Sequence, residues 1–190
     1  MKGDAAQLAG SFVTVDRTLD QEFEARLVES STLAFRVAYG VLRQRQDAED
    51  VAQEAFVKAY RSFTQLRDRD RFRAWLVRIT WRLALDRQRA DRRRLVREGR
   101  RPGPFGPGSG AAENDLLARE RAQLLWNAID ALPEKLRIAI VLANIQEHDI
   151  DEVARLLDLP AGTVKSRLFD ARKKLKESLQ WMQKTDSASR

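Results

Sequence analysis

Arginine is the side chain whose clustering most clearly predicts chemistry in this sequence. Between residues 67 and 101 it occurs fourteen times against five acids. Its planar guanidinium group binds phosphates and guanine edges through paired hydrogen bonds. Just upstream, residues 47–54 carry four acids and no base. These two faces predict a protein partner for the acidic one and nucleic acid for the basic one, although a charged helix face can also be simply solvated.

The sequence pattern lacks the residues expected for catalysis or metal binding. The single histidine, His148, has no partner at ligand spacing and stands just before an expected helix cap, so we expect it on the surface. The chain has no cysteine, which excludes disulfides and thiolate metal sites. A glycine-rich phosphate loop and a nucleophile motif are also missing. We therefore expect no enzymatic activity, no metal site and no cofactor.

The composition is that of a basic globular protein with a polyanionic partner. The 190 residues carry a net charge of +7 with a pI near 10.1, and they can form one large or two small domains. The N-terminal segment lacks the apolar core of a signal peptide, and no window approaches the length of a membrane span. We expect a cytoplasmic protein that does not insert into a membrane.

Helical periodicity predicts an all-α fold of two small helical domains. Residues 1–18 show no sustained period and are expected to form a loose arm. Residues 20–42 repeat apolar side chains at helical spacing and predict a first helix. Whether this helix is broken near Ser30 and Ser31 is left open at this point.

Two further helices are expected before residue 97. One begins at about Asp47, where acids in the first turn suit the helix dipole, and the other runs from Phe72 to about Arg94. Residues 64–71 form a short polar connection between them. Trp81 falls off the apolar stripe of the later helix, so stacking on an unpaired base and a small separate hydrophobic contact are both open interpretations.

A segment rich in glycine and proline divides the chain. Residues 99–110 contain five glycines and three prolines, which cannot sustain the interior of a helix or strand. We expect a first domain at residues 19–97, a linker at 98–112 and a four-helix domain at 113–182. The prolines should make this linker stiffer than a glycine-serine tether.

The second domain has the spacing of a helix-turn-helix unit. Asp149 and Glu152 stand at capping-box spacing and open a short helix. Residues 159–162, Leu-Pro-Ala-Gly, form a turn, after which Thr163 is expected to open and cap a basic helix. In such a unit the second helix enters the major groove of duplex DNA. An ordinary helical hairpin with a basic outer face is the alternative.

Two blocks of sequence together resemble the extracytoplasmic-function (ECF) group of bacterial RNA polymerase sigma factors. The first is DAEDVAQEAFVKAYRSF followed by FRAWLVRITWRLALDRQR, and the second is LPEKLRIAIVLANIQEHDIDEVARLLDLPAGTVKSRLFDARKKLKESL. The resemblance covers nearly all of residues 20–180. It implies an alternative sigma factor that binds core RNA polymerase, directs it to specific promoter DNA and helps to melt the −10 element. It also implies an anti-sigma factor as a partner, which nothing in the sequence itself shows.

The resemblance assigns roles to side chains of the first domain. Its acidic face would dock on the coiled coil of the largest polymerase subunit, through Asp47, Asp50, Gln53 and Glu54. The connection at 64–71 and the following helix would open the −10 element and capture an unstacked base. The residues singled out for this step are Arg67, Arg78, Trp81, Arg82 and Arg89. Arg82 stands where the family often has asparagine, which leaves the identity of the captured base open.

In the second domain, the resemblance makes the helix from Thr163 the reader of the −35 element. Contacts to bases are expected from Lys165, Ser166 and Phe169, and contacts to phosphate from Thr163, Arg167 and Arg172. Asp170 departs from the family, which often has a basic residue there. An acid is repelled by phosphate but can accept a hydrogen bond from a cytosine amino group, so we expect a shifted −35 preference.

Two other classes of protein fit part of the sequence. A polymerase-independent helix-turn-helix regulator would explain the second domain, but it leaves the paired acidic and arginine-rich helices without a joint role. An RNA-binding or adaptor protein would explain the arginines and not the second domain. The regulator predicts tight duplex binding by this protein alone, which separates it from a sigma factor.

Overall fold

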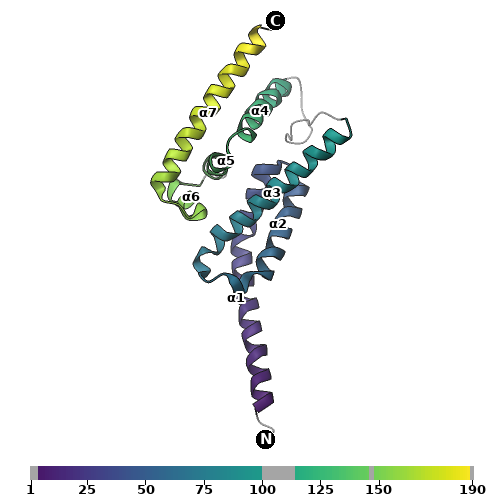
Figure 1. Cartoon of the computed structure of the whole chain (residues 1–190), viewed down its shortest axis with the longest axis vertical. Coiled ribbons are helices and arrows are strands. Elements are labelled where there is room, and N and C mark those ends of the chain that lie inside the picture. Colours follow the sequence, from purple (N-terminus) through teal and green to yellow (C-terminus); the bar gives the residue numbers. More distant parts are fainter. Residues whose placement is uncertain (1–3, 100–113, 146–147, 189–190) are drawn as a thin grey trace.

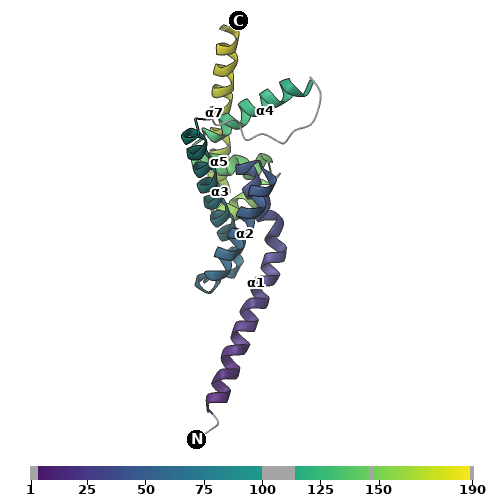
Figure 2. The same ribbon diagram turned by 90° about the vertical axis from the view of Figure 1, so that its right-hand side faces the viewer.

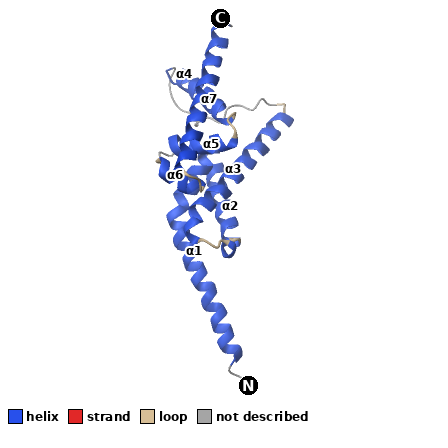
Figure 3. Ribbon diagram, turned by 60° about the vertical axis from the view of Figure 1, so that its left-hand side comes forward, coloured by secondary structure: helices blue, strands red, loops and turns tan. Residues whose placement is uncertain are grey.

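The computed structural model describes residues 4–99, 114–145 and 148–188, with side chains described at 19–99, 120–143 and 148–180. Every regular element within these ranges is helical, as the sequence predicts, and none of them is a strand (Figure 3). The helices form two groups, and the expected linker between them falls largely on residues 100–113, outside the described part of the chain.

The first group contains three long helices, with two 3₁₀ turns before the third. In chain order they are α1 (Asp4–Leu42), α2 (Arg45–Arg61), η1 (Phe63–Gln65), η2 (Arg69–Arg71) and α3 (Phe72–Arg97). The N-terminal part of α1 projects away from α2 and α3 (Figures 1 and 2).

The expected loose arm at residues 1–18 is wrong, because α1 already begins at Asp4. Adding residues to an existing helix avoids the cost of nucleating one, and the Ala-Ala-Gln-Leu-Ala run at residues 5–9 has high helix propensity. The open question at Ser30 and Ser31 is also settled, since α1 runs through both. Ser31 donates its hydroxyl hydrogen bond to the carbonyl oxygen of Val28 at 3.1 Å within the helix.

Aromatic side chains join α1 to the connection between α2 and α3. Phe23 of α1 meets Phe63 and Phe72 edge to face, with ring centroids 5.1 and 5.9 Å away. Phe63 and Phe72 also meet each other at 5.8 Å. All three rings are buried. Such edge-to-face pairs add to the hydrophobic burial of each ring, so this cluster fixes both ends of the short connection.

The second group is the four-helix domain with a helix-turn-helix that the sequence predicts. It comprises α4 (Asn114–Asp130), α5 (Glu134–Ile140), α6 (Ile150–Leu157) and α7 (Ala161–Ala188), with a π-helical turn, η3 (Val141–Ile145), after α5. Pro133 precedes α5, where its missing N–H costs nothing because the first turn of a helix has no internal acceptor for it.

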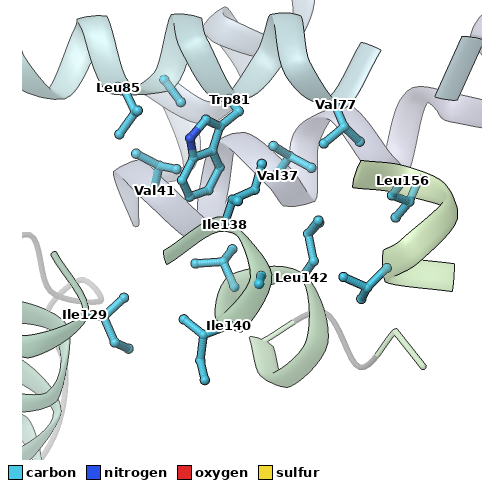
Figure 4. Close-up of a cluster of buried hydrophobic side chains, with 14 of the residues drawn as sticks. Val37, Val41, Val77, Trp81, Leu85, Ile129, Ile138, Ile140, Leu142 and Leu156 are labelled. Atoms are coloured by element: carbon cyan, nitrogen blue, oxygen red, sulfur yellow. The ribbon is translucent and has the colours of Figure 1, made fainter. Parts of the chain in front are cut away.

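The two groups pack against each other through a shared hydrophobic core. Val37, Val41, Val77, Trp81 and Leu85 contribute from α1 and α3. From the second group, Ile138 and Leu142 lie opposite them, and Leu156 of α6 approaches the end of α3 that carries Val77 (Figure 4). Of the two interpretations left open for Trp81, this arrangement favours a hydrophobic contact over base stacking, and the contact belongs to the main core and not to a small separate one. The Trp81 side chain is 3% exposed and points toward Ile138. The residue that covers it therefore belongs to α5 of the second group.

Candidate nucleic-acid interface

The acidic face lies along α2, opposite the alanines and valine that α2 buries. Gln44 caps the helix by accepting a hydrogen bond from the backbone N–H of Asp47. The Asp47 carboxylate is half-buried and pairs with Arg87 of α3 at 2.6 Å. Asp50, Gln53 and Glu54 are exposed. Three of the four predicted side chains therefore lie on one accessible face, while Asp47 ties that face to α3.

Arg69 organises the connection between α2 and α3, a role that the sequence analysis did not assign. Its guanidinium group stacks on the Phe63 ring, 3.9 Å from the centroid, and donates to the carbonyl oxygens of Phe63 and Leu66. The Phe63 carbonyl also accepts from the backbone N–H of Leu66 at 3.1 Å, so Arg69 adds a second donor there and joins the two carbonyls of the turn. Arg67, the predicted DNA contact in this connection, is exposed.

A cavity of about 690 Å³ opens between the end of α2 and one face of α3. Trp75, Ile79 and Leu83 supply apolar walls, and the predicted residues Arg78 and Arg82 both line it. Its polar lining also includes Lys58, Arg61, Ser62, Gln65 and Asp86. Its size lies within the range of about 300–1,000 Å³ typical of small-molecule sites, so it can hold an unstacked base.

The other three residues predicted for the −10 element, Arg67, Trp81 and Arg89, do not line this cavity. Arg89 follows it along α3 and pairs with Asp86 at 3.3 Å, with both side chains exposed. Trp81 lies on the buried side of α3 and cannot stack on a base while the two helical groups are packed together. The structure therefore gathers Arg78 and Arg82 at one cavity, and places Trp81 away from it.

The two residues that flank α6, Asp149 and Asp158, cap its ends within the helix-turn-helix. Asp149 accepts a hydrogen bond from the backbone N–H of Glu152 at 2.7 Å, which confirms the predicted N-cap. The reciprocal half of the capping box is replaced, because the Glu152 side chain pairs with His148 and Arg73 instead. At the other end Asp158 adopts a left-handed backbone with φ of 56°, a conformation that Asp and Asn tolerate better than most residues.

The reading helix begins two residues earlier than the sequence analysis expects. It starts at Ala161, and the backbone N–H of Thr163 donates to the carbonyl oxygen of Pro160 at 2.9 Å. Thr163 therefore lies within the first turn, and the expectation that it caps the helix is wrong. Pro160 immediately precedes the helix, and its carbonyl oxygen accepts from the backbone N–H groups of both Thr163 and Val164.

One face of α7 is buried and the opposite face carries the predicted DNA contacts. Val164, Leu168 and Ala171 are buried at helical spacing. The exposed side chains of the opposite face are Lys165, Ser166, Phe169, Asp170 and Arg172, while Thr163 and Arg167 are half-buried. Phe169 is 69% exposed, so its ring is accessible to a partner.

His148 is mostly covered, so the expectation of a surface histidine is wrong. Its side chain is 11% exposed, and its Nδ1 lies 2.9 Å from Oε2 of Glu152. Partial burial acts to raise the pKa of Glu152, but hydrogen bonds from His148 and Arg73 outweigh it and the pKa lies below its usual value. His148 also lines a cavity of about 510 Å³ beside Phe169 of the reading helix.

The part of the chain that the structure describes contains no cluster of metal ligands and no helix that could span a membrane. No three or more His, Asp or Glu side chains there gather as a metal ion would require. Among the same residues, each helix is too short or too polar to cross a bilayer.

These features define an all-α protein of two helical groups, the second of which contains a helix-turn-helix. Comparison with known families agrees. Residues 27–94 match Sigma-70 region 2, and residues 122–175 match Sigma-70, region 4. Residues 27–94 are therefore region 2 of this chain, and residues 122–175 are region 4.

Curated relatives give the same family. The ECF RNA polymerase sigma-E factor of Escherichia coli (strain K12) is 36% identical over 149 residues, which are 70% of this chain and 74% of that protein. Its namesake from Haemophilus influenzae is 32% identical over 151 residues, 72% of this chain and 76% of that protein.

Chains from two solved complexes share the fold. The sigma factor RpoE bound to the anti-sigma factor NepR from Bartonella quintana superposes with a TM-score of 0.54 at 22% identity, covering 84% of this chain and 98% of that one. CnrH bound to the cytosolic domain of CnrY gives 0.51 at 27% identity, with 83% and 87% covered.

The chain therefore belongs to the ECF family of RNA polymerase sigma factors. As a member of that family it is a transcription initiation factor, which binds core RNA polymerase and directs it to promoter DNA.

Proposed function

We propose that the charged surfaces of this chain divide the work of an alternative sigma factor. The exposed face of α2 binds core polymerase, the face of α3 with its cavity opens the −10 element, and α7 reads the −35 element. One observation supports the proposal. The accessible acidic face of α2 and the basic face of α3 lie in the range that matches sigma region 2, and the basic face of α7 lies in the range that matches region 4.

The polymerase contact consists of Asp50, Gln53 and Glu54, with Asp47 holding α2 in place through its pair with Arg87. Carboxylates at the edge of an interface add mainly to the association rate and to specificity. This face would meet a basic surface on the polymerase.

Opening of the −10 element uses the cavity between α2 and α3. An unstacked base enters beside Trp75, where Arg78 and Arg82 supply guanidinium donors to its edge. Arg67 and Arg89 hold phosphates of the separated strand from either side of the cavity. Trp81 contributes only after the second domain has moved away.

Reading of the −35 element uses the exposed face of α7 in the major groove. Lys165, Ser166 and Phe169 contact base edges, and Phe169 is suited to a thymine methyl group. Thr163, Arg167 and Arg172 contact phosphate, and Asp170 accepts from a cytosine amino group. Domains at residues 19–97 and 113–182, joined by a linker at 98–112, bind their two elements as a tethered pair.

The proposal extends to partners and place of action. Both similar solved structures contain a second protein, and by analogy an anti-sigma factor binds this chain until a signal releases it. The chain acts in the cytoplasm, where core polymerase is found. It performs no chemistry of its own, since strand opening needs binding energy alone.

Binding to core polymerase tests the assignment of the α2 face. The double variant Asp50→Arg/Glu54→Arg should weaken binding of the full chain to core polymerase at least tenfold, because it reverses the charge of two exposed side chains. Glu24→Arg, at an exposed acid of α1, is the matched control. Equal affinities for the double variant and the control would refute this assignment.

A further inference from the structure

Region 4 is joined to region 2 by a buried polar cluster centred on Asp130. This last residue of α4 pairs with Arg43, which follows α1, at 2.6 Å and with Arg92 of α3 at 3.3 Å. It also pairs with Arg137 of its own domain at 2.9 Å. Gln88 of α3 donates to the same carboxylate at 3.4 Å and accepts from Arg137 at 3.0 Å. One carboxylate therefore connects α4 and α5 to α1 and α3.

The cluster holds more positive than negative charge. The side chains of Arg43, Arg137 and Asp130 are 4%, 7% and 7% exposed, so two buried guanidinium groups share one buried carboxylate. Burial lowers the pKa of Arg137 although Asp130 opposes that change. Nη1 and Nε of Arg43 and Nε of Arg137 have no hydrogen-bond acceptor among the described residues. Asp130 is thus the group whose removal leaves two buried cations uncompensated.

Aromatic rings and backbone geometry hold the two arginines in place. Arg43 lies over Trp126 of α4, 4.6 Å from the ring centroid, and Arg137 lies over Trp81 of α3 at 5.8 Å. Each contact crosses from one region to the other. Arg43 also has a left-handed backbone with φ of 57°, which costs a non-glycine residue about 1 kcal/mol. That conformation persists only where side-chain contacts such as the Asp130 pair hold it.

Carboxylates of α6 occupy arginines beside the −10 cavity. Asp158 pairs with Arg71 at 2.9 Å and with Arg78 at 3.1 Å, and Glu152 pairs with Arg73 at 2.9 Å. These arginines lie in the segment assigned to the −10 element. The carboxylate oxygens of region 4 therefore occupy the positions that phosphates of DNA would take. The same contact covers Trp81 with Ile138.

We infer that the free chain inhibits itself by folding region 4 onto region 2, with Asp130 as the latch that holds the two regions together. This inference rests on the sigma role, because it states how promoter opening is withheld before polymerase binds. A ligand that binds only the open form has its apparent affinity reduced by the fraction of chains that are open. Core polymerase and promoter DNA are that ligand, and their binding separates the two regions.

Energy transfer between two dyes on the full chain measures the separation directly. The chain has no cysteine, so Gln21→Cys on α1 and Lys173→Cys on α7, both exposed, give two specific labelling positions. Asp130→Asn keeps the size of the side chain and removes its charge. Asp151→Asn removes one exposed charge from the first turn of α6 and is the matched control. Affinity for core polymerase is measured on the same variants.

We expect Asp130→Asn to lower the energy transfer of the free chain and to tighten apparent binding to core polymerase about tenfold or more, because breaking a buried pair costs more than the pair contributes. Asp151→Asn should match the wild type. At saturating core polymerase all variants should give equal transcription. Wild-type transfer and affinity in an Asp130→Asn protein of unchanged helicity would overturn the inference.

A second variant keeps the test decisive if Asp130→Asn fails to fold. Glu152→Gln/Asp158→Asn removes the outer pairs, and asparagine retains the left-handed turn at 158. It should lower energy transfer and tighten binding about two- to fivefold, since exposed pairs contribute little each. No change in either readout overturns the inference. A chain that never supports core-dependent transcription overturns the sigma role instead, and the transfer measurement, made without polymerase, separates the two failures.

Discussion

The N-cap of α6 gives a prediction whose magnitude follows from the structure. Asp149→Ala removes the carboxylate that accepts from the backbone N–H of Glu152 at 2.7 Å. Helix α6 has only eight residues, so its first turn is a large part of its hydrogen bonding. Loss of such a cap costs about 0.5–2 kcal/mol of the free energy of unfolding. For a chain of this size, 1 kcal/mol lowers the Tm by about 2–4 °C.

Thermal unfolding of the full chain, followed by circular dichroism, is the assay. Asp151→Ala is the control, because Asp151 is exposed in the same turn and no cap bond is seen for it in the described structure. It should lower the Tm by less than half as much as Asp149→Ala. Asp149→Asn should restore most of the loss, since asparagine is also a good cap. Equal losses for the two alanine variants would refute the reasoning.

Three shorter predictions concern promoter choice and pH. Asp170→Arg should change the preferred −35 sequence in a randomised-promoter selection, and an unchanged preference would show that this side chain does not read bases. Arg82→Asn should alter preference at one −10 position, by about 1–3 kcal/mol of discrimination, and leave −35 preference as it is. Because the pKa of Glu152 is lowered in the folded chain, its ionised form stabilises the contact with Arg73 above the ordinary pKa of 4.5, and that contribution is lost as the pH falls through the lowered value. Energy transfer in the labelled chain should therefore fall as the pH is lowered below 4.5, and Glu152→Gln should flatten this change; parallel curves would contradict it.

Local sequence features predicted the individual helices well. Apolar periodicity predicts α2, α3 and the four helices of the second domain, and the Asp149 cap is confirmed by its bond to Glu152. The sequence places the start of α7 two residues too late. Threonine is common at the N-cap, so the residue type of Thr163 does not distinguish a cap from a position in the first turn. The expected arm at residues 1–18 fails because a low apolar content does not prevent an existing helix from growing.

The contact between the two domains could not be predicted from sequence. Trp81 falls off the stripe that packs within region 2, and the partner that buries it, Ile138, lies far along the chain beyond the linker. His148 is instead covered within its own domain, where its Nδ1 lies 2.9 Å from Oε2 of Glu152 four residues later. Periodicity reports which face of a helix is buried within its own domain. It does not predict whether another domain covers the side chains that are left exposed, such as Trp81.

Run-off transcription tests the central claim most directly. Purified core polymerase is supplied with a library of randomised promoters, with and without this chain. The account predicts specific starts that appear only when the chain is added, with a −10 and a −35 element common to the selected promoters. The absence of such starts, together with sequence-specific binding of duplex DNA by the chain alone, would contradict it and favour a polymerase-independent regulator.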